Sequence, residues 1–353
     1  MSRVRKKVFQ VSTTTKDFWS KVPVAVIGGG SWGTVLAQLA AQNSPEVRVW
    51  IRNEEIAREM NSTRSNKKYV PGMTLNPKIR VYTEIERVFE AQPRMVIWAL
   101  PSHGTREQAK KFAHFFTGEE VLIHATKGIE QGTMKRISEI LAEELPCPRI
   151  GVVSGPNLAH EIARNEPAAT VIASSFKEVI DAGQAVLSGP VFRVYGVSDV
   201  VGVEWAGTLK NILAIASGCL DSMGFGWNAR ALLISRGLAE MVRFGTAMGG
   251  SVETFLGLAG IGDLLATCSS NLSRNYRVGA RLAKGEPLAK VLEELGSTAE
   301  GVRTSRSVWA FAEKRGIDMP ITEGVCQIID GKLPASEVLK TLMLKPLATD
   351  VPA

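Results

Sequence analysis

The stretch VAVIGGGSWG at residues 24–33 decides the fold of the first half of the chain. A short apolar run, Val22–Ile27, is typical of a buried strand, and a helical pattern follows the glycines. Between them stand Gly28, Gly30 and Gly33, in the spacing G-x-G-x-x-G. The first glycine permits a tight turn, the second lets a pyrophosphate approach the backbone, and the third allows close helix–strand packing. We predict a dinucleotide-binding turn; the alternative is a turn with a purely structural role.

Outward from this turn, strands and helices alternate. The strand-like runs lie at Val47–Ile51, Val96–Leu100, Val121–His124 and Ile150–Val153, with two more at Ala169–Ala173 and Phe192–Tyr195 for the far edge. Such alternation predicts a parallel, doubly wound sheet of Rossmann type. A stretch rich in proline and glycine, Asn61–Lys78, predicts a long loop.

The second half of the chain has a different pattern. From about residue 203 the strand-like runs disappear, and helical patterns separated by glycines follow one another. We therefore expect a Rossmann-type α/β domain at 22–202 and an all-α domain at 203–353, with the boundary near Ser198–Val203. The basic residues 1–21 are expected to be a frayed extension, because no apolar run of about 7–15 residues follows them as in a signal peptide.

Composition narrows the class of protein. The 353 residues include 42 Lys+Arg and 35 Asp+Glu, a net charge of +7, and 45% are hydrophobic, which excludes bulk disorder. The four cysteines are far apart, which argues against a disulfide framework or a metal site and for a reducing compartment. The uncharged stretch Val22–Pro45 carries four glycines, so we expect no membrane span.

The end of the second expected strand bears on the choice of cofactor. It runs into Arg52 and Asn53, and no acid appears before Glu54. An acid here binds the ribose 2′-hydroxyl of NAD, whereas a guanidinium suits the 2′-phosphate of NADP. We predict NADP(H) bound by Arg52, with NAD(H) as the alternative cofactor and an exposed loop arginine as the alternative role.

Lys210 is the first candidate for chemistry, because it lies in an otherwise uncharged helical run that reaches Leu220. Its neighbours on the same helix face are all small, namely Ala206, Gly207, Ala214 and Ser217. Such a face lets another domain approach closely. A lysine that is desolvated, or close to a second cation such as Lys127, has a lowered pKa and exchanges protons near neutrality. The alternative is a lysine at a helix–helix seam.

Two loops after expected strands supply further candidates. Lys127, in ATKGIE, follows Val121–His124, and Gly155, in SGP, follows Ile150–Val153. Ligands of open α/β sheets bind at the carboxyl ends of strands, so both residues could line one crevice. The alternatives are a solvated surface lysine and an ordinary strand–helix turn.

The helical half adds an acid and a polar cluster. Asp263, in GLAGIGD, stands at an expected helix start, where it serves either the site or a simple cap. Ser273, Arg274 and Asn275 place a hydroxyl, a guanidinium and an amide in succession, a set suited to a phosphate monoester. The alternative is an ordinary polar loop.

Taken in order, these motifs resemble the bacterial-type NAD(P)-dependent glycerol-3-phosphate dehydrogenase family. They are GGGSWGT (28–34), PSH (101–103), ATKGIE (125–130), SGP (154–156), GTLKNILAIASG (207–218), NARALLISRGLAEM (228–241), GLAGIGDLLATC (257–268), SRNYRVG (273–279) and AEGV (299–302). Asn157 and Leu158 depart from the family's small hydroxyl residue and aromatic, so we expect no side-chain role at 157.

The resemblance implies a cytoplasmic oxidoreductase that transfers hydride reversibly between NAD(P)H and dihydroxyacetone phosphate, giving sn-glycerol 3-phosphate for phospholipid synthesis. It implies Lys210 as general acid/base, with Lys127 and Asp263 as supporting catalytic groups. The implied substrate-binding residues are Lys127, Gly155, Lys210, Asp263, Ser273, Arg274 and Asn275. The implied cofactor-binding residues are Gly28, Gly30, Ser31, Trp32, Gly33, Arg52, Lys127, Ala159, Arg274 and Glu300.

Two other functions fit parts of the pattern. A reductase for a 3-hydroxyacid or a phosphogluconate would also pair a Rossmann half with a helical half, but the SRN cluster together with GIGD favours a small phosphate ester. A cofactor-binding sensor that acts on nucleic acid would use the positive charge. We expect no nucleic-acid partner, because beyond the first seven positions the basic residues are scattered. The oligomeric state stays open, with a homodimer as the assembly to test.

Overall fold

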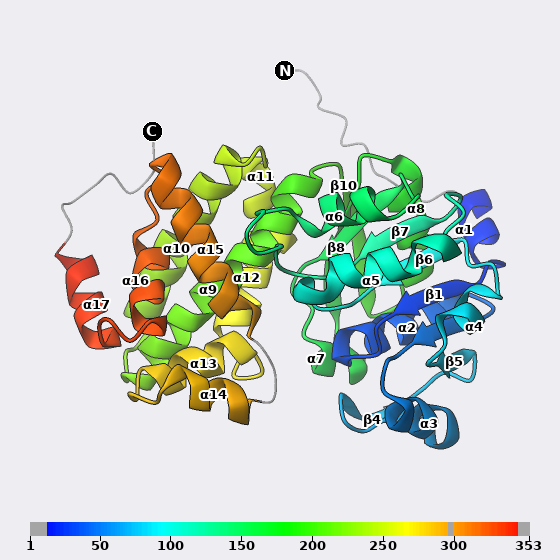
Figure 1. Ribbon diagram of the computed structural model, residues 1–353, viewed down its shortest axis with the longest axis horizontal. Coiled ribbons are helices and arrows are strands. Elements are labelled where there is room, and N and C mark those ends of the chain that lie inside the picture. The colour runs from blue at the N-terminus through cyan, green and yellow to red at the C-terminus, as the bar shows by residue number, and fades with distance from the viewer. Residues whose placement is uncertain (1–12, 296–298, 345–353) are drawn as a thin grey trace.

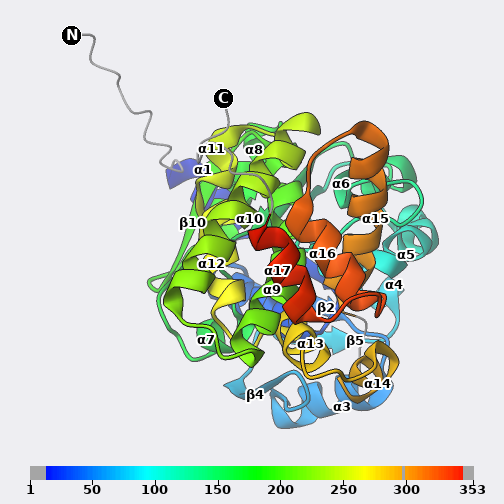
Figure 2. The ribbon, with the colours of Figure 1, turned by 90° about the vertical axis from the view of Figure 1, so that its left-hand side faces the viewer.

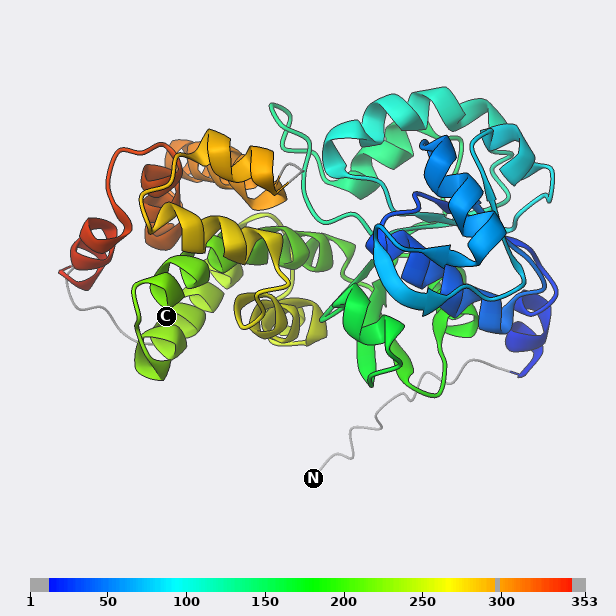
Figure 3. The same cartoon turned by 90° about the horizontal axis from the view of Figure 1, so that it is seen from below.

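The computed structural model describes residues 13–295 and 299–344. A sheet half and a helical half lie side by side, and strands occur only in the first of them within the described residues (Figures 1 and 3). The expected fold class, a doubly wound parallel sheet followed by an all-α half, is therefore confirmed.

The central sheet has eight strands in the order β10-β9-β8-β7-β6-β1-β2-β5. Their bounds are β1 Val24–Ile27, β2 Val47–Trp50, β5 Ile79–Tyr82, β6 Met95–Trp98, β7 Val121–His124, β8 Ile150–Ser154, β9 Ala168–Ala173 and β10 Phe192–Val197. All neighbouring pairs are parallel except β8 and β9. The order reverses between β1 and β6, the point at which ligands bind in such sheets.

Helices cover both faces of the sheet. Their bounds are α1 Thr13–Trp19, α2 Ser31–Asn43, α3 Glu54–Thr63, α4 Ile85–Phe89, η1 Ser102–Gly104, α5 Thr105–Phe112, η2 Ala113–Phe115, α6 Ile137–Glu144, α7 Ala159–Ala163 and α8 Lys177–Leu187. Alternate residues of β1 enter two cores: Val24 and Val26 pack with α2 and α8, whereas Ala25 and Ile27 pack with α5 and α6. Because the central strands are buried on both faces, they read as uninterrupted apolar runs.

The helical half is built around α9, Val200–Ser222, most of which is buried. The other elements are α10 Trp227–Ala247, α11 Val252–Phe255, the π-helical turn η3 Leu258–Gly262, α12 Asp263–Cys268, α13 Arg274–Leu282, α14 Leu288–Glu294, α15 Glu300–Arg315, α16 Pro320–Ile329 and α17 Ala335–Met343. Helices α10, α12, α13 and α15 all pack on α9, while α17 is outermost (Figure 2). None of the described helices has both the length and the apolar character needed to cross a bilayer.

Three details differ from the sequence-based expectations. The expected loop Asn61–Lys78 contains a small antiparallel pair, β3 Ser65–Asn66 with β4 Val70–Thr74, and the edge strand β5 follows it unpredicted. The expected frayed extension 1–21 is wrong in its last part, because α1 forms there and the apolar indole of Trp19 is buried against the core. Residues 1–12 of that extension lie outside the described residues.

The expected domain boundary stays a prediction. Strand β10 ends at Val197 and α9 begins at Val200, so a continuous helix runs through the expected boundary region. The first turns of α9 pack on β8, and its later turns form the axis of the helical half. The two halves are thus joined by a shared helix.

Candidate functional site

The glycine-rich turn has the geometry that the sequence predicted. Gly28 has φ +117°, and a Cβ there would lie 2.6 Å from the carbonyl oxygen of Ala99. A Cβ at Gly33 would lie 1.9 Å from the carbonyl oxygen of Gly28, so helix and strand pack closely only because this residue is glycine. At Gly30 a Cβ would meet nothing within 4 Å. The middle glycine therefore borders open space into which a phosphate group fits.

The N-terminus of α2 faces that space with its polar groups available. Gly30 is the N-cap and offers no side chain, and the first turn carries no acid. The backbone N–H groups at the helix start, with the positive end of the helix dipole, suit a pyrophosphate. The Ser31 hydroxyl donates to the carbonyl oxygen of Tyr69 at 2.9 Å, and the Trp32 indole N–H is buried without a hydrogen-bond partner in the described residues. These residues fit a dinucleotide, although the side-chain roles of Ser31 and Trp32 stay predictions.

Arg52 lies two residues after the end of β2 and is exposed, and the described residues give it no ion-pair partner. Asn53 caps α3 by accepting a hydrogen bond from the Ile56 N–H at 2.9 Å, and Glu54 begins the helix as expected. The end of the strand is therefore followed by an exposed guanidinium, and no acid precedes Glu54. This arrangement fits a 2′-phosphate better than a free 2′-hydroxyl.

The centre of the site is a buried carboxylate held between two ammonium groups. Asp263, the first residue of α12, is 1% exposed. Its Oδ1 accepts from Lys210 Nζ at 2.5 Å, and its Oδ2 accepts from Lys127 Nζ at 2.6 Å. Lys127 also donates to the carbonyl oxygen of Gly155 at 3.1 Å. The structure thus brings together four of the predicted residues from the loops after β7 and β8, from α9 and from α12.

Thr267 belongs to the same cluster and was missed by the sequence analysis. Its hydroxyl accepts from Lys210 Nζ at 2.5 Å and lies 3.3 Å from Asp263 Oδ1. Asp263 and Thr267 are one helical turn apart on α12, so both side chains reach the same ammonium. The i,i+4 spacing of an acid and a hydroxyl in DLLAT was the signal that could have identified it.

The environment of Lys210 lowers its pKa to about 8. Burial is the largest cause, because a desolvated ammonium is disfavoured; the Asp263 carboxylate opposes the shift, and the nearby Lys127 cation adds to it. The small face of α9 makes this possible. A Cβ at Gly207 would lie 2.9 Å from Ser154 Oγ and 3.5 Å from Lys127 Cγ, so a glycine here lets the end of β8 and the loop that carries Lys127 approach the helix.

The predicted phosphate cluster is used partly for folding. Ser273 is the N-cap of α13 and accepts from the Tyr276 N–H at 3.3 Å. Asn275 is buried; its amide donates to Asn211 Oδ1 at 2.9 Å and accepts from the Gly301 N–H at 3.1 Å. Arg274 lies between them and is exposed. Substrate contacts by these three residues stay predictions.

Glu300 and Ala159 are two further residues that the resemblance assigned to the cofactor. Glu300 begins α15, and its carboxylate accepts from the Ser102 N–H at 3.1 Å and from the Ser102 hydroxyl at 2.5 Å, linking the halves. Ala159 begins α7 after the SGP loop and is partly exposed. Asn157 donates from its amide to Thr170 Oγ1 at 2.9 Å, within the sheet half. No cluster of metal-ligating side chains occurs within 13–295 and 299–344.

The sequence matches known families over both halves. Residues 23–180 match the family described as NAD-dependent glycerol-3-phosphate dehydrogenase N-terminus, and residues 199–340 match its C-terminus. The chain is 43% identical over 326 residues to glycerol-3-phosphate dehydrogenase [NAD(P)+] of Solidesulfovibrio magneticus, covering 92% of this chain and 98% of that protein. It is 44% identical over 329 residues to the enzyme of the same name from Pseudomonas paraeruginosa, covering 93% and 96%.

Solved structures agree with the sequence comparisons. Glycerol-3-phosphate dehydrogenase from Coxiella burnetii superposes with a TM-score of 0.87 at 35% identity, covering 92% of this chain and 100% of that one. The yeast enzyme superposes with a TM-score of 0.80 at 27% identity, covering 91% and 99%. Sequence motifs, fold and relatives therefore lead to one conclusion: the chain belongs to the family of NAD(P)-dependent glycerol-3-phosphate dehydrogenases.

Proposed function

We propose that Lys210 is the general acid and base in the reduction of dihydroxyacetone phosphate to sn-glycerol 3-phosphate by this chain. The chain is an NAD(P)-dependent oxidoreductase of that family, and the reaction provides the glycerol backbone of phospholipids. The observation that carries the assignment is the pair of ammonium groups on one buried carboxylate, with the pKa of Lys210 lowered to about 8.

The residues of the sheet half fit the cofactor. The backbone at Gly30 and the start of α2 would hold the pyrophosphate, and Arg52 would bind a 2′-phosphate, which favours NADP(H) over NAD(H). When bound, the reduced nicotinamide supplies a hydride to the substrate carbonyl carbon.

The lysines act on the carbonyl oxygen. As this oxygen gains negative charge, Lys210 donates a proton to it and Lys127 stabilises the charge electrostatically. Asp263 keeps both ammonium groups in place, since each of its oxygens accepts a hydrogen bond from one of them. Arg274, with its neighbours Ser273 and Asn275, is proposed to bind the phosphate and so to orient the reacting carbon.

Substitution of Lys210 by alanine tests the assignment. Turnover should fall by at least ~100-fold, because proton transfer by a positioned group contributes that much or more. The dissociation constant for NADPH, from fluorescence titration, should stay within about twofold, because Lys210 is not among the residues proposed to bind the cofactor. Turnover near the wild-type value would remove Lys210 from this role.

Location and assembly are also proposals. We propose a cytoplasmic protein, supported by four buried cysteines that form no disulfide. We propose a homodimer, supported by the exposed aromatic side chains of Phe225 and Trp227 beside the start of α10. Light scattering of the purified protein tests the assembly, and a monomer mass at all concentrations would contradict it.

A further inference from the structure

Besides Asp263 of α12, the site region has a second buried carboxylate, Glu204, which lies on α9 six residues before Lys210. Glu204 is 5% exposed, and its partners come from the sheet half. Its Oε1 accepts from the Ser138 N–H at 2.9 Å and lies 3.1 Å from His124 Nε2. Its Oε2 accepts from Arg136 Nη1 at 2.7 Å and from the Ser138 hydroxyl at 2.6 Å. One helix therefore carries Lys210 and an anion that is bound to the opposite half.

This anion is strongly stabilised. Burial alone would raise the pKa of Glu204, but His124, Arg136 and Ser138 outweigh burial and lower it to about 2. Glu204 therefore keeps its negative charge over the whole neutral range. A buried charge with good partners is costly to separate from them, so the contact fixes the relative position of the groups that it joins.

The partners of Glu204 lie at both ends of one segment, residues 125–136. His124 ends β7, three residues before Lys127, and Arg136 immediately precedes α6. Between them the chain folds back on itself: Ile129 pairs with Arg136 as an antiparallel bridge, and the Glu130 N–H donates to the carbonyl oxygen of Lys135 at 2.9 Å. Glu204 thus holds the two ends of a short closed loop that carries Lys127.

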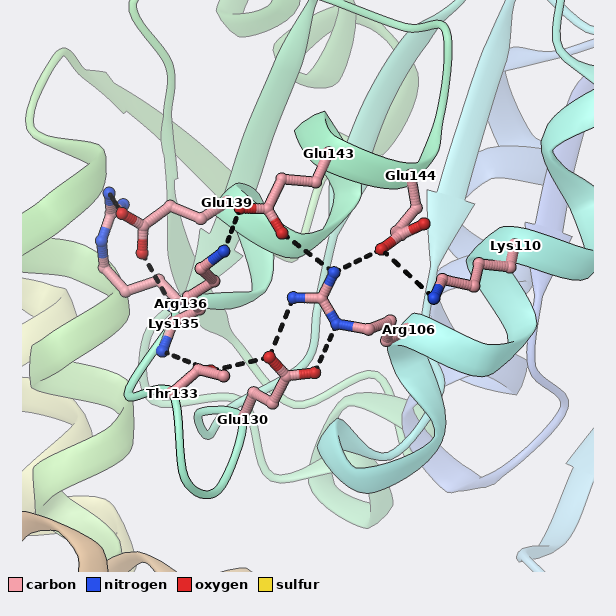
Figure 4. Close-up of polar contacts among 9 residues, drawn as sticks. All are labelled: Arg106, Lys110, Glu130, Thr133, Lys135, Arg136, Glu139, Glu143 and Glu144. Carbon is pink, nitrogen blue, oxygen red and sulfur yellow. Dashed lines mark hydrogen bonds and ion pairs between the residues drawn. The ribbon is translucent and has the colours of Figure 1, made fainter.

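The outer side of this loop is attached to the sheet half by a separate network (Figure 4). Arg106 of α5 donates to both oxygens of Glu130, at 2.6 and 2.8 Å, and to Glu143 of α6 at 2.9 Å. Thr133 donates to Glu130 at 2.7 Å. This network anchors the loop on the side away from α9. Towards the helical half, Ile129 of the loop packs into the core around α9, and Glu204 adds the buried ionic link to the helix that carries Lys210.

We propose that Glu204 is a positioning residue that holds Lys127 opposite Lys210 and Asp263. The two α9 residues are separated by about 9 Å along the helix, at about 1.5 Å per residue, so a single rigid element sets the distance between the anchor and the reacting amine. The proposal rests on the proposed role of Lys210 and deepens it. A residue that only joined the two halves would contribute to stability and would have no effect on the position of Lys127.

The pKa of Lys210 separates these two roles. The groups that face its amine are Asp263 and Thr267 of α12 and Lys127 of the loop, with the Cys268 thiol nearby. If the loop shifts, Lys127 withdraws, and the pKa of Lys210 rises because a neighbouring cation is lost and Asp263 is left to it alone. Loss of stability alone lowers the folded fraction but does not move this pKa.

The test is the pH dependence of kcat/KM for dihydroxyacetone phosphate in the full-length variant Glu204→Gln. In the reductive direction kcat/KM falls at high pH, as Lys210 loses its proton. This alkaline limb of the pH profile reports the pKa of Lys210 in the free enzyme. We expect kcat to fall at least ~10-fold and the limb to move up by at least ~0.5 pH unit. The dissociation constant for NADPH should stay within about twofold, because the glycine turn is untouched.

Glu240→Gln is the matched control. Glu240 is 3% exposed and accepts hydrogen bonds from the Thr322 N–H and hydroxyl at 3.2 and 3.1 Å, but these contacts lie within the helical half. This variant should lose stability and keep the wild-type alkaline limb. Should Glu204→Gln fail to fold, Ser138→Ala replaces it, because it removes the hydroxyl that donates to Glu204. A smaller upward shift of the alkaline limb is expected for this variant.

Two results overturn the proposal without touching the role of Lys210. One is a Glu204→Gln enzyme whose kcat per folded molecule and alkaline limb equal those of the wild type. The other applies if Glu204→Gln does not fold: the alkaline limb of the Ser138→Ala enzyme then lies at the wild-type pH. If instead Lys210→Ala keeps its turnover, the general acid assignment fails first, and the two failures are thereby distinguished.

Discussion

Replacement of Lys210 by methionine should make the stability of the protein depend less on pH. Lys210 is 6% exposed, and its pKa is lowered from 10.5 to about 8. The difference of about 2.5 units (10.5 − 8), at about 1.4 kcal/mol per unit, disfavours the folded ammonium by about 3 kcal/mol. Methionine keeps the length of the side chain but carries no charge, so this unfavourable contribution disappears.

The sign and size of the pH effect follow from the two pKa values. Below about pH 8 the lysine is protonated in both states, and the full 3 kcal/mol, roughly, opposes folding. As the pH rises towards 10.5 the folded protein has released the proton while the unfolded chain still binds it, so wild-type stability increases. Between about pH 7 and about pH 9.5 the wild type should therefore gain about 2 kcal/mol of stability relative to Lys210→Met.

Urea unfolding of both proteins at the two pH values measures this change. Lys314→Met is the control, because Lys314 is exposed near the end of α15, and its effect on stability should stay constant within about 0.5 kcal/mol. A Lys210→Met effect that is the same at both pH values would refute the reasoning. It would mean that Asp263 fully compensates the desolvation of the ammonium.

Three further predictions concern cofactor and substrate. Gly33→Ala should lower the free energy of unfolding by ~1–3 kcal/mol or more, because its Cβ would lie 1.9 Å from a backbone oxygen. Gly30→Ala should keep the thermal stability but weaken NADPH binding at least ~10-fold, because its Cβ would enter the space proposed for the phosphates. Equal destabilisation by the two substitutions would contradict this. Arg52→Glu should lower the ratio of kcat/KM for NADPH to that for NADH at least ~10-fold, and an unaltered ratio counts against a 2′-phosphate contact. Arg274→Ala should raise the KM for dihydroxyacetone phosphate at least ~10-fold, and an unchanged KM rejects its phosphate role.

The elements predicted best from the sequence are those buried on both faces. Strand β7, VLIH, was predicted with its observed bounds because a short, mainly apolar run between helical patterns is typical of a strand in an alternating α/β domain. Strand β5, IRVY, was missed because it lies at the sheet edge, and Arg80 faces solvent. Helix α1 was missed because a basic stretch before it suggested an extension, although Trp19 anchors it to the core.

The site was predictable where local patterns carry the chemistry. The glycine turn and the lysine on a small-residue helix face are visible in short windows of sequence. Glu204 was not, because its partner Arg136 is 68 residues away and no periodicity connects them. Ser273 shows the converse: a hydroxyl before a helix suits both a cap and a ligand, and the structure uses it as a cap.

Only Ser198 and Asp199 separate the last strand from α9, and Asp199 itself caps that helix by accepting from the Gly202 N–H at 2.8 Å. The junction is therefore too short to act as a flexible linker, and any relative motion of the two halves must tilt or slide the surfaces that pack along α9. The same geometry constrains recombination among relatives. A chimera that joins one enzyme's first half to another's second half must exchange α9 together with the loops after β7 and β8, or its parts will meet out of register.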